Sequence, residues 1–190
     1  GIPAPGTELR LVDASENDVR PGEPGELLLS GPNLFSGYWR RPDEMARAFT
    51  ADGWFRTGDI AVCDADGYLT IVDRRKDMYI SGGENVYPAE IEAALADFPG
   101  LIEVAIVGVP DARWGEVGVC AMSHVDADET LAERVRTHLA SRLAGYKLPR
   151  HVLVVEALPR TGSGKVRKGD LRTLCLARLE ASDDAASPVG

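Results

Sequence analysis

Apolar and polar residues alternate over short stretches in the first 73 residues, a pattern typical of half-buried β-strands. Four strands are expected, and the last two are separated by an Asp-Gly turn that predicts a hairpin: 8–13, 25–31, 60–64 and 67–73. A helix is expected at 42–49, because Pro42 suits the first helical position and Asp43 and Glu44 follow it in the first turn. The first part of the chain is therefore predicted to be β-rich.

The pattern changes after Asp73, where helical and strand-like periods alternate. Pro88 begins a predicted helix whose Ile91, Leu95 and Phe98 lie on one face. The remaining expected elements are strands at 104–109, 117–125 and 151–156, a loop at 110–116, and helices at 129–143 and from 169 onward. The sequence thus predicts an α+β fold, with a β-rich domain over 1–73, a small mixed α/β domain over 74–176, and a disordered tail over 177–190.

The composition is that of a folded protein, with 44% hydrophobic and 27% charged residues among 190. Thirty acidic residues against 21 basic ones give a net charge of −9, which disfavours binding to nucleic acid. No apolar run approaches the roughly 18 residues of a membrane span, and the start lacks the regions of a signal peptide. We therefore expect a cytoplasmic protein, and a chain that starts with Gly1 is expected to have been cut from something longer.

Cysteine and histidine supply no obvious reactive centre. The three cysteines, Cys63, Cys120 and Cys175, are far apart and lack metal-ligand spacing, so free buried thiols are predicted and no metal site is expected. The three histidines are scattered and have no Ser, Cys or Asp partner at a recognisable spacing, so they are interpreted as structural.

The segment 158–168 is the strongest candidate for anion binding. Its glycines allow a ligand to approach the backbone, and four cations supply positive charge: Arg160, Lys165, Arg167 and Lys168. It is not a phosphate loop of the Walker A type, because Pro159 and Val166 stand where that motif needs Gly and Ser or Thr. Loops of this composition are more often solvated basic turns, so both interpretations stay open.

Two further segments are candidates. Gly82 and Gly83 precede the helix at Pro88 and could line a narrow channel, although paired glycines are also ordinary turn residues. Asp59 could accept hydrogen bonds from two sugar hydroxyls, as acidic residues do in nucleotide sites, but a turn role is commoner.

The order of the motifs is more specific than any one of them. It runs through the segments 25–31, 37–39, 53–59, 66–69, 73–77, 82–92 and 159–165. This succession, over about residues 1–175, resembles the adenylate-forming superfamily of acyl-CoA synthetases, luciferases and peptide-synthetase adenylation domains. The Gly-Gly-Glu-Asn-Val-Tyr-Pro segment looks like that of the acid:CoA ligases. The resemblance implies that 1–73 is the end of a β-rich, distorted-barrel subdomain of a large domain, and that a mobile C-terminal domain follows.

The resemblance also implies roles for single residues in nucleotide chemistry. Asp59 would bind the ribose hydroxyls of ATP, and Arg74 would contact the ribose or hold the hinge. Asp73 would be the hinge between the domains. Lys165 would be the mobile catalytic lysine that meets the carboxylate and the phosphate during adenylation.

For the second half-reaction, the resemblance implies that Gly82 and Gly83, with Glu84 beside them, line the tunnel for the pantetheine arm of coenzyme A. ATP, Mg²⁺ and CoA would be the cofactors, with the Mg²⁺ ligand outside this chain, and a small carboxylic acid, fatty or aromatic, the substrate. The family's phosphate loop, adenine segment and acyl pocket are absent from the 190 residues, so the partner is the missing N-terminal region, and the chain alone is expected to be inactive in adenylation.

Two other functions remain open. One is a non-catalytic lid or regulatory module that binds a nucleotide or a partner. The other is an adenylation domain that loads an amino acid onto a carrier protein.

Overall fold

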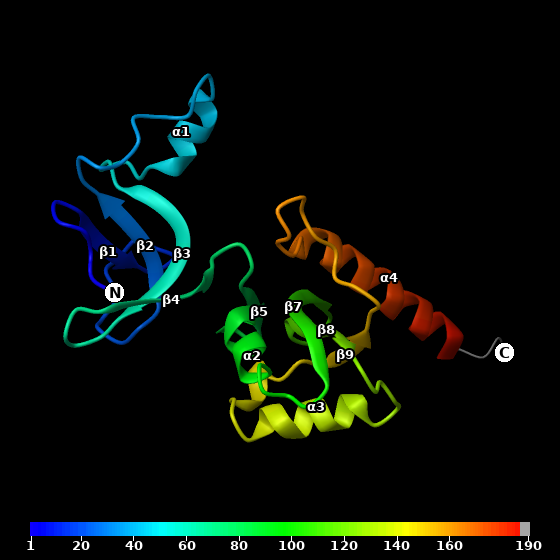
Figure 1. The fold of residues 1–190 in the computed structure, drawn as a ribbon. Helices are drawn as coiled ribbons and strands as arrows, with labels where there is room; N and C mark the ends of the chain where they lie inside the picture. The colour runs from blue at the N-terminus through cyan, green and yellow to red at the C-terminus, as the bar shows by residue number, and fades with distance from the viewer. Residues whose placement is uncertain (187–190) are drawn as a thin grey trace. The chain divides into compact units, whose positions relative to one another are not determined.

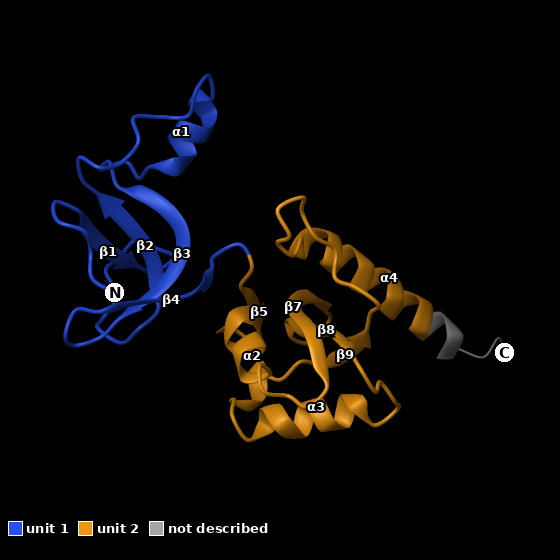
Figure 2. Cartoon of the chain, viewed as in Figure 1, with its two compact units in different colours: residues 1–76 blue, residues 77–190 orange. Residues whose placement is uncertain are grey.

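The computed structural model describes residues 1–186, which form two compact units (Figure 2). Unit 1 comprises residues 1–76, and unit 2 begins at Asp77. The boundary was expected directly after Asp73. It lies further along because Arg75 is held in unit 1: its backbone N–H donates to the carbonyl of Gly58 at 2.8 Å, and its guanidinium pairs with Glu26 at 2.8 Å.

Unit 1 is built on an antiparallel sheet in the order β1-β2-β3-β4 (Figure 1). Its strands are β1 (Glu8–Val12), β2 (Gly25–Ser30), β3 (Phe55–Cys63) and β4 (Leu69–Arg74). The predicted hairpin is confirmed as β3 and β4, and Leu11, Leu27 and Ala61 form the buried centre of the sheet. Within the described residues β1 and β4 each have one neighbour, so the sheet is open and the expected distorted barrel is not closed.

The helix of unit 1, α1 (Pro42–Ala48), begins at the predicted proline and has Asp43 and Glu44 in its first turn. None of its residues is fully buried, so the helix depends on its flanks for attachment. The rings of Phe35 and Phe49 lie 5.1 and 5.5 Å from that of Phe55 on β3. These aromatic contacts fix α1 next to the sheet.

Unit 2 has a five-stranded sheet in which β8 is central. The strands follow the order β6-β5-β8-β7, and each neighbouring pair in this order is antiparallel. The fifth strand, β9, pairs with β8 in parallel. The elements in chain order are β5 (Tyr79–Ser81), β6 (Glu84–Val86), α2 (Pro88–Ala94), β7 (Leu101–Asp111), β8 (Gly115–His124), α3 (Leu131–Ala140), a 3₁₀ turn (Gly145–Lys147), β9 (His151–Val154) and α4 (Lys168–Ala186).

The β7–β8 hairpin buries both of its faces. One face carries Ile106, Cys120 and Met122, which pack with the apolar stripes of α2 and α3. The opposite face carries alternate residues such as Val107 and Val119, which pack against α4 (Figure 1). Because successive side chains of a strand point to opposite faces, one hairpin supports helices on both sides.

Two expectations about unit 2 are wrong. The loop expected at 110–116 is a tight turn, because β7 runs to Asp111 and β8 starts at Gly115. The carboxylate of Asp111 closes this turn by accepting the N–H groups of Arg113 and Trp114 at 2.8 and 2.9 Å.

The tail expected to be disordered over 177–190 is helical as far as Ala186, where α4 ends. The extension is held because Leu179 packs on the sheet face that α4 covers, and Arg178 donates to the carbonyl of Val154 at 2.7 Å. Residues 187–190 lie outside the described part of the chain. Among the described residues, none of the helices combines the length and the hydropathy of a membrane span.

Tyr79 is wedged against two glycines of the hairpin. It is 3% exposed, and a Cβ added at Gly108 would overlap its Cβ, while one added at Gly118 would overlap its hydroxyl. Burial raises the pKa of Tyr79 well above its ordinary value, so the phenol stays neutral. Glycine is therefore required at both positions, because a side chain there would overlap Tyr79.

We predict that Gly108→Ala destabilises unit 2 by about 1–3 kcal/mol, the usual cost of overpacking a core. The matched control is Gly169→Ala near the start of α4, where an added Cβ meets nothing within 4 Å and where alanine favours the helix. Urea unfolding, followed through the amide resonances of β7 and β8, should show a lower midpoint for the first variant and an unchanged or higher one for the second. Equal midpoints would contradict the wedge.

Candidate functional site

In unit 1, Asp59 and Arg74 lie opposite one another on neighbouring strands. They are registered partners of β3 and β4, and Arg74 Nε lies 2.7 Å from Asp59 Oδ1. The pair is only partly covered, with side-chain exposures of 59% for Arg74 and 26% for Asp59. The structure thus brings together the two residues expected at the ribose, and leaves both accessible to a ligand.

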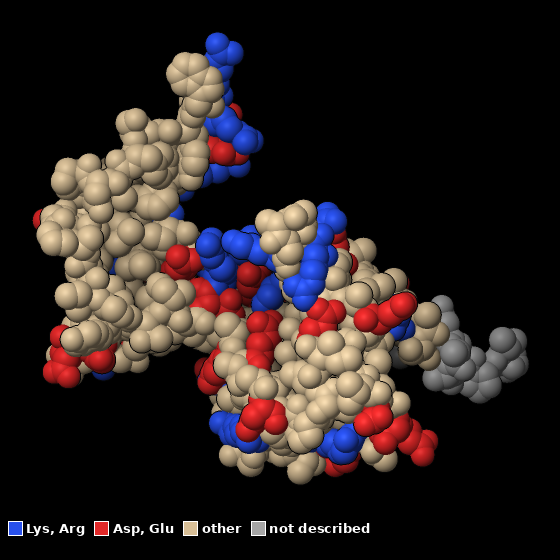
Figure 3. Space-filling view, in the orientation of Figure 1, with Lys and Arg blue, Asp and Glu red and all other residues tan. Residues whose placement is uncertain are grey.

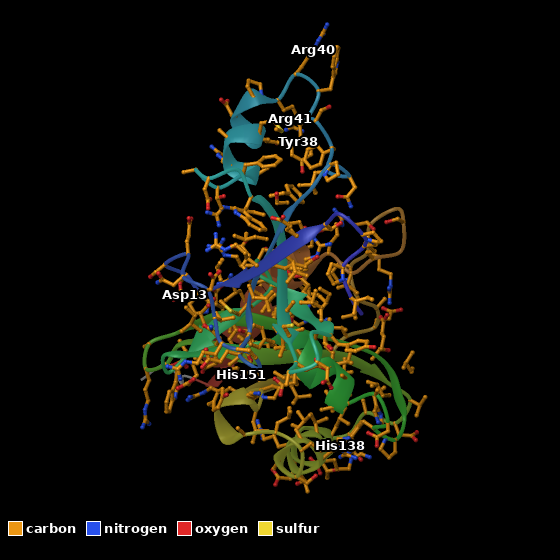
Figure 4. The ribbon with its side chains drawn as sticks, turned by 90° about the vertical axis from the view of Figure 1, so that its left-hand side faces the viewer. Asp13, Tyr38, Arg40, Arg41, His138 and His151 are labelled. Atoms are coloured by element: carbon orange, nitrogen blue, oxygen red, sulfur yellow. The ribbon has the colours of Figure 1, made fainter. Side chains whose placement is uncertain are left out.

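A cavity of about 510 Å³ lies beside this pair. Five cations and two carboxylates are among its lining residues, which are Glu26, Tyr38, Glu44, Arg47, Ala48, Arg56, Thr57, Gly58, Arg74, Arg75 and Lys76. Glu26 is almost fully buried and accepts from Arg56 at 3.2 Å and Arg75 at 2.8 Å. Tyr38 lies near α1, and Arg40 points away from the sheet beyond it (Figure 4). The excess of cations makes the cavity suited to an anion.

Asp73 does not lie at the unit boundary. It is 9% exposed within β4, opposite Ile60, and its carboxylate accepts the N–H of Arg74 at 2.7 Å. The turn between the units lies beyond it, at 75–77.

In unit 2, the segment 158–168 folds into a small hairpin loop. The N–H groups of Thr161 and Gly164 donate to the carbonyls of Lys165 and Thr161 at 2.8 and 2.9 Å, and Arg167 N–H donates to the carbonyl of Pro159 at 2.8 Å. Gly164 has φ +85°, a conformation that favours glycine. The loop therefore has a defined backbone.

The loop contains one unpaired cation. Arg160 pairs with Glu103, Arg167 with Asp170, and Lys168 with Glu92. Among the described residues Lys165 has no ion pair, and its side chain is exposed. Figure 3 shows basic side chains gathered over this loop before α4. Of the four cations the sequence singled out, the structure leaves only Lys165 free to meet an incoming anion.

Gly82 and Gly83 form the two-residue turn between β5 and β6. Both have positive φ, +61° and +89°, which matches the turn type that joins twisted hairpin strands. Gly82 N–H donates to the carbonyl of Trp114 at 2.9 Å, and a Cβ at Gly82 would lie 2.8 Å from the Trp114 ring. Glu84 follows on β6 and is exposed. Nothing larger than glycine fits at 82.

A second cavity, of about 350 Å³, lies next to this turn and was not predicted. It is lined by Ser81, Trp114, Val117, Gly145, Tyr146, Leu148 and Arg150. Trp114 and Tyr146 are 41% and 43% exposed, so two aromatic surfaces and a guanidinium face solvent here. No local signal in the sequence links Trp114 to Tyr146, 32 residues later.

The remaining candidates carry no chemistry. Burial raises the pKa of Cys120 to about 12 and that of Cys175 to about 11, so both thiols stay protonated, which fits the predicted inert, free cysteines. Cys63 is free but half-buried. His138 on α3 and His151 on β9 lie on different elements (Figure 4). Over the described residues, no group of three or more His, Cys, Asp or Glu side chains could hold a metal ion.

Two family models match the chain: the AMP-binding enzyme C-terminal domain over residues 90–165, and the AMP-binding enzyme over residues 1–39. Feruloyl-CoA synthase from Amycolatopsis sp is 50% identical over 177 residues, which cover 90% of this chain and 35% of that protein. Indoleacetate–CoA ligase from Aromatoleum aromaticum is 48% identical, over 92% of this chain and 34% of the relative. The long-chain-fatty-acid–CoA ligase of Salmonella typhimurium is 46% identical, over 90% and 30%. The chain thus spans about a third of the length of these curated relatives.

Solved structures agree with these relatives. ATP-bound MatB from Rhodopseudomonas palustris matches with a TM-score of 0.82 and 38% identity, over 92% of this chain and 35% of that one. The o-succinylbenzoate CoA synthetase of Bacillus subtilis, in complex with its acyl-adenylate intermediate, matches with a TM-score of 0.81 and 34% identity, over 90% and 34%. Since segments of both units match AMP-binding enzyme models and the relatives named above are CoA ligases, the chain belongs to the adenylate-forming superfamily.

Proposed function

We propose that this chain supplies the C-terminal part of an ATP-dependent acid:CoA ligase that activates an aromatic or fatty carboxylic acid. The observation that carries the proposal is the free ammonium of Lys165 on a well-defined loop whose other cations are all paired. The relatives support the class of substrate, because those named above act on feruloyl, indoleacetate and long-chain fatty acyl groups.

In the first half-reaction, a carboxylate oxygen of the acid forms a bond to the α-phosphorus of ATP, and the bond to the β-phosphate oxygen breaks, so that pyrophosphate leaves. Both reactants are already negatively charged, and during the transfer further charge builds up on the α-phosphate oxygens and on the leaving pyrophosphate. The ammonium of Lys165 offsets that charge at the transition state, and Asp59 accepts hydrogen bonds from the ribose hydroxyls while Arg74 orients its carboxylate.

In the second half-reaction, the sulfur of CoA forms a bond to the acyl carbon and the bond from that carbon to AMP breaks, with the thiol proton lost to solvent. Gly83 leaves open space for the pantetheine arm beside Glu84, while Gly82 lets the turn pack against the Trp114 ring. The neighbouring cavity, with Trp114, Tyr146 and Arg150, is suited to an aromatic base and an anion.

Mg²⁺ fits none of the described residues, because they form no group of acidic or histidine side chains able to hold it. We propose that it arrives with ATP and that its protein ligand belongs to the rest of the enzyme. The structure of a B. subtilis relative with ATP and magnesium ion supports this cofactor pair. We further propose that the enzyme acts in the cytoplasm, where ATP and CoA are found.

The test of the function compares the full-length protein with this 190-residue chain. We predict that the full-length protein exchanges pyrophosphate into ATP when an aromatic or fatty acid is present, and that it releases AMP on addition of CoA. The chain alone should do neither, because it supplies only part of the charge and positioning that such a transfer needs. Exchange by the chain alone would contradict the prediction. AMP release only with a carrier protein would favour an amino-acid-loading domain, and no turnover by the full-length protein would favour a lid.

We predict that Lys165→Ala in the full-length protein slows acyl-adenylate formation by about 10²-fold or more, the scale for loss of a transition-state charge partner. Thioester formation from supplied acyl-adenylate should persist. Lys168→Ala is the matched control, because it removes a cation of the same segment that is already paired with Glu92. Equal losses in both half-reactions of the Lys165 variant, with the fold intact, would restore the interpretation of the loop as a solvated basic turn.

A pair of proline variants locates the hinge. Proline fixes φ near −65°, so it should hinder a domain rotation wherever the chain has to turn. If Asp73 is the hinge, Asp73→Pro slows the thioester step more than adenylation. Asp73 lies inside β4, and the unit boundary follows Lys76. We therefore predict that Lys76→Pro is the variant that slows the thioester step more than adenylation. Separate assays of the two half-reactions decide, and equal losses in both steps for both variants would argue against a hinge here.

A further inference from the structure

The base of the Lys165 loop is attached to the sheet of unit 2 through one side chain. Glu103, on β7, accepts the N–H of Leu158 at 2.7 Å, where the chain enters the loop. Its other carboxylate oxygen pairs with the guanidinium of Arg160, two residues further on. One carboxylate therefore holds both a backbone and a side-chain group of the incoming strand.

The contact continues through Arg160 to the position next to Lys165. Arg160 Nη1 donates to the carbonyl of Gly164 at 2.7 Å, while Nη2 meets Glu103. Arg167 Nε donates back to the carbonyl of Arg160 at 3.2 Å. The guanidinium thus spans the open end of the hairpin and fixes the peptide that precedes Lys165.

Glu103 is well placed for this role. Its side chain is 20% exposed and comes from β7, the longest strand of unit 2. Burial raises the pKa of its carboxyl, but the Leu158 N–H and the Arg160 guanidinium outweigh burial and lower the pKa overall, so the carboxylate is ionised at neutral pH. Charge-assisted hydrogen bonds of this kind are short and directional.

We propose that Glu103 is a positioning residue for adenylation, which acts through Arg160 to hold the Lys165 loop in the geometry that the reaction uses. The inference rests on the proposed function of Lys165. A flexible lysine on a loop of glycines and small polar residues gains little from its charge unless the backbone beneath it is fixed, because a displacement of about 1 Å can cost about 10²-fold in rate.

The chain contains a matched control for this role. Glu92, on α2, also accepts a backbone N–H, that of Ile106 at 2.9 Å, and also pairs with a cation of the same segment, Lys168 at 2.9 Å. It anchors the start of α4, and no hydrogen bond or ion pair joins it to residues 160–165 in the described part of the chain. Glu92→Gln therefore removes a comparable anchor of the fold and leaves the loop attached.

The first measurement is amide hydrogen exchange in the 190-residue chain. Glu103→Gln should speed exchange at Leu158 and at the hairpin amides of Thr161, Gly164 and Arg167 by about tenfold or more, since local opening exposes these groups. Glu92→Gln should leave these four amides unchanged. Unchanged exchange in Glu103→Gln would overturn the proposed attachment, whatever the enzyme does.

The second measurement uses the full-length protein and a double-mutant cycle with Lys165→Ala. Glu103→Gln should lower the rate of adenylation by about 10- to 100-fold, with thioester formation from supplied acyl-adenylate unchanged. Glu103→Asp should restore part of the loss because it keeps the charge. On the Lys165→Ala background, Glu103→Gln should cost nothing more, because the group it positions is gone.

Independent, additive losses from the two substitutions would overturn the inference and make Glu103 a general support of the fold. If Glu103→Gln keeps full adenylation while Lys165→Ala loses it, the inference about Glu103 is overturned and the proposed function of Lys165 stands. Full adenylation by Lys165→Ala would overturn the proposed function of the lysine and this inference together.

Discussion

The burial of both faces of the β7–β8 hairpin is the constraint on which unit 2 depends. Val107 and Val119 point to one side and Ile106 and Cys120 to the other, so the two strands form the middle layer between α4 and the pair α2 and α3. A hairpin of this kind buries apolar area on both faces, which strengthens the driving force for its formation and fixes its register. The hairpin therefore fixes the positions of the elements attached to it.

Both functional segments of unit 2 are attached to this hairpin at different points. The Gly82–Gly83 turn bonds to Trp114, in the tight turn that joins β7 to β8. The Lys165 loop is attached through Glu103, near the other end of β7. The hairpin thus carries two glycine-containing segments, and specific hydrogen bonds hold the backbone of each. Separate attachment of the two segments suits the proposed enzyme, which uses one segment in each half-reaction.

In unit 1 the corresponding support is electrostatic. Glu26 is nearly buried on β2 and is accompanied by two guanidiniums, those of Arg56 and Arg75, so its charge is compensated. Arg75 is thereby retained in unit 1, which moves the boundary between units past Asp73. The exposed Asp59–Arg74 pair lies on the adjoining strands. The buried Glu26 cluster stabilises the strands that carry Asp59 and Arg74 and leaves this pair accessible to a ligand.

Much of this arrangement could be predicted from the sequence, since alternation, proline at helix starts and apolar stripes reveal the local elements. The start of α1 at Pro42 and the stripe of Ile91 and Leu95 are such cases. The length of α4 could not be predicted, because it depends on the contact of Leu179 with a sheet distant in sequence. The open edge of the first sheet and the turn at Asp111 likewise follow from pairing, not from composition.

The site shows the same division. The cationic loop could be found from its composition, but composition could not show which of its four cations is free to bind a ligand. Only the partners of Arg160, Arg167 and Lys168, which come from other elements or from the helix that follows, leave Lys165 free. Likewise the pairing of Trp114 with Tyr146 around a cavity is a product of the fold. Sequence identifies the residue types, and tertiary contacts decide which of them are available for chemistry.

Lys165 is expected to meet the acyl-adenylate centre, whereas Lys147 and Lys168 are held by their carboxylate partners. The most direct measurement is an NMR titration of the full-length protein, labelled with ¹⁵N in its lysine side chains, with a non-reactive acyl-sulfamoyl adenosine. Lys165 can be assigned by its loss in Lys165→Ala. We predict that the analogue shifts the Lys165 ammonium resonance and leaves those of Lys147 and Lys168, which are paired with Glu90 and Glu92, in place. Binding of the analogue with no change at Lys165 would exclude this role for the lysine.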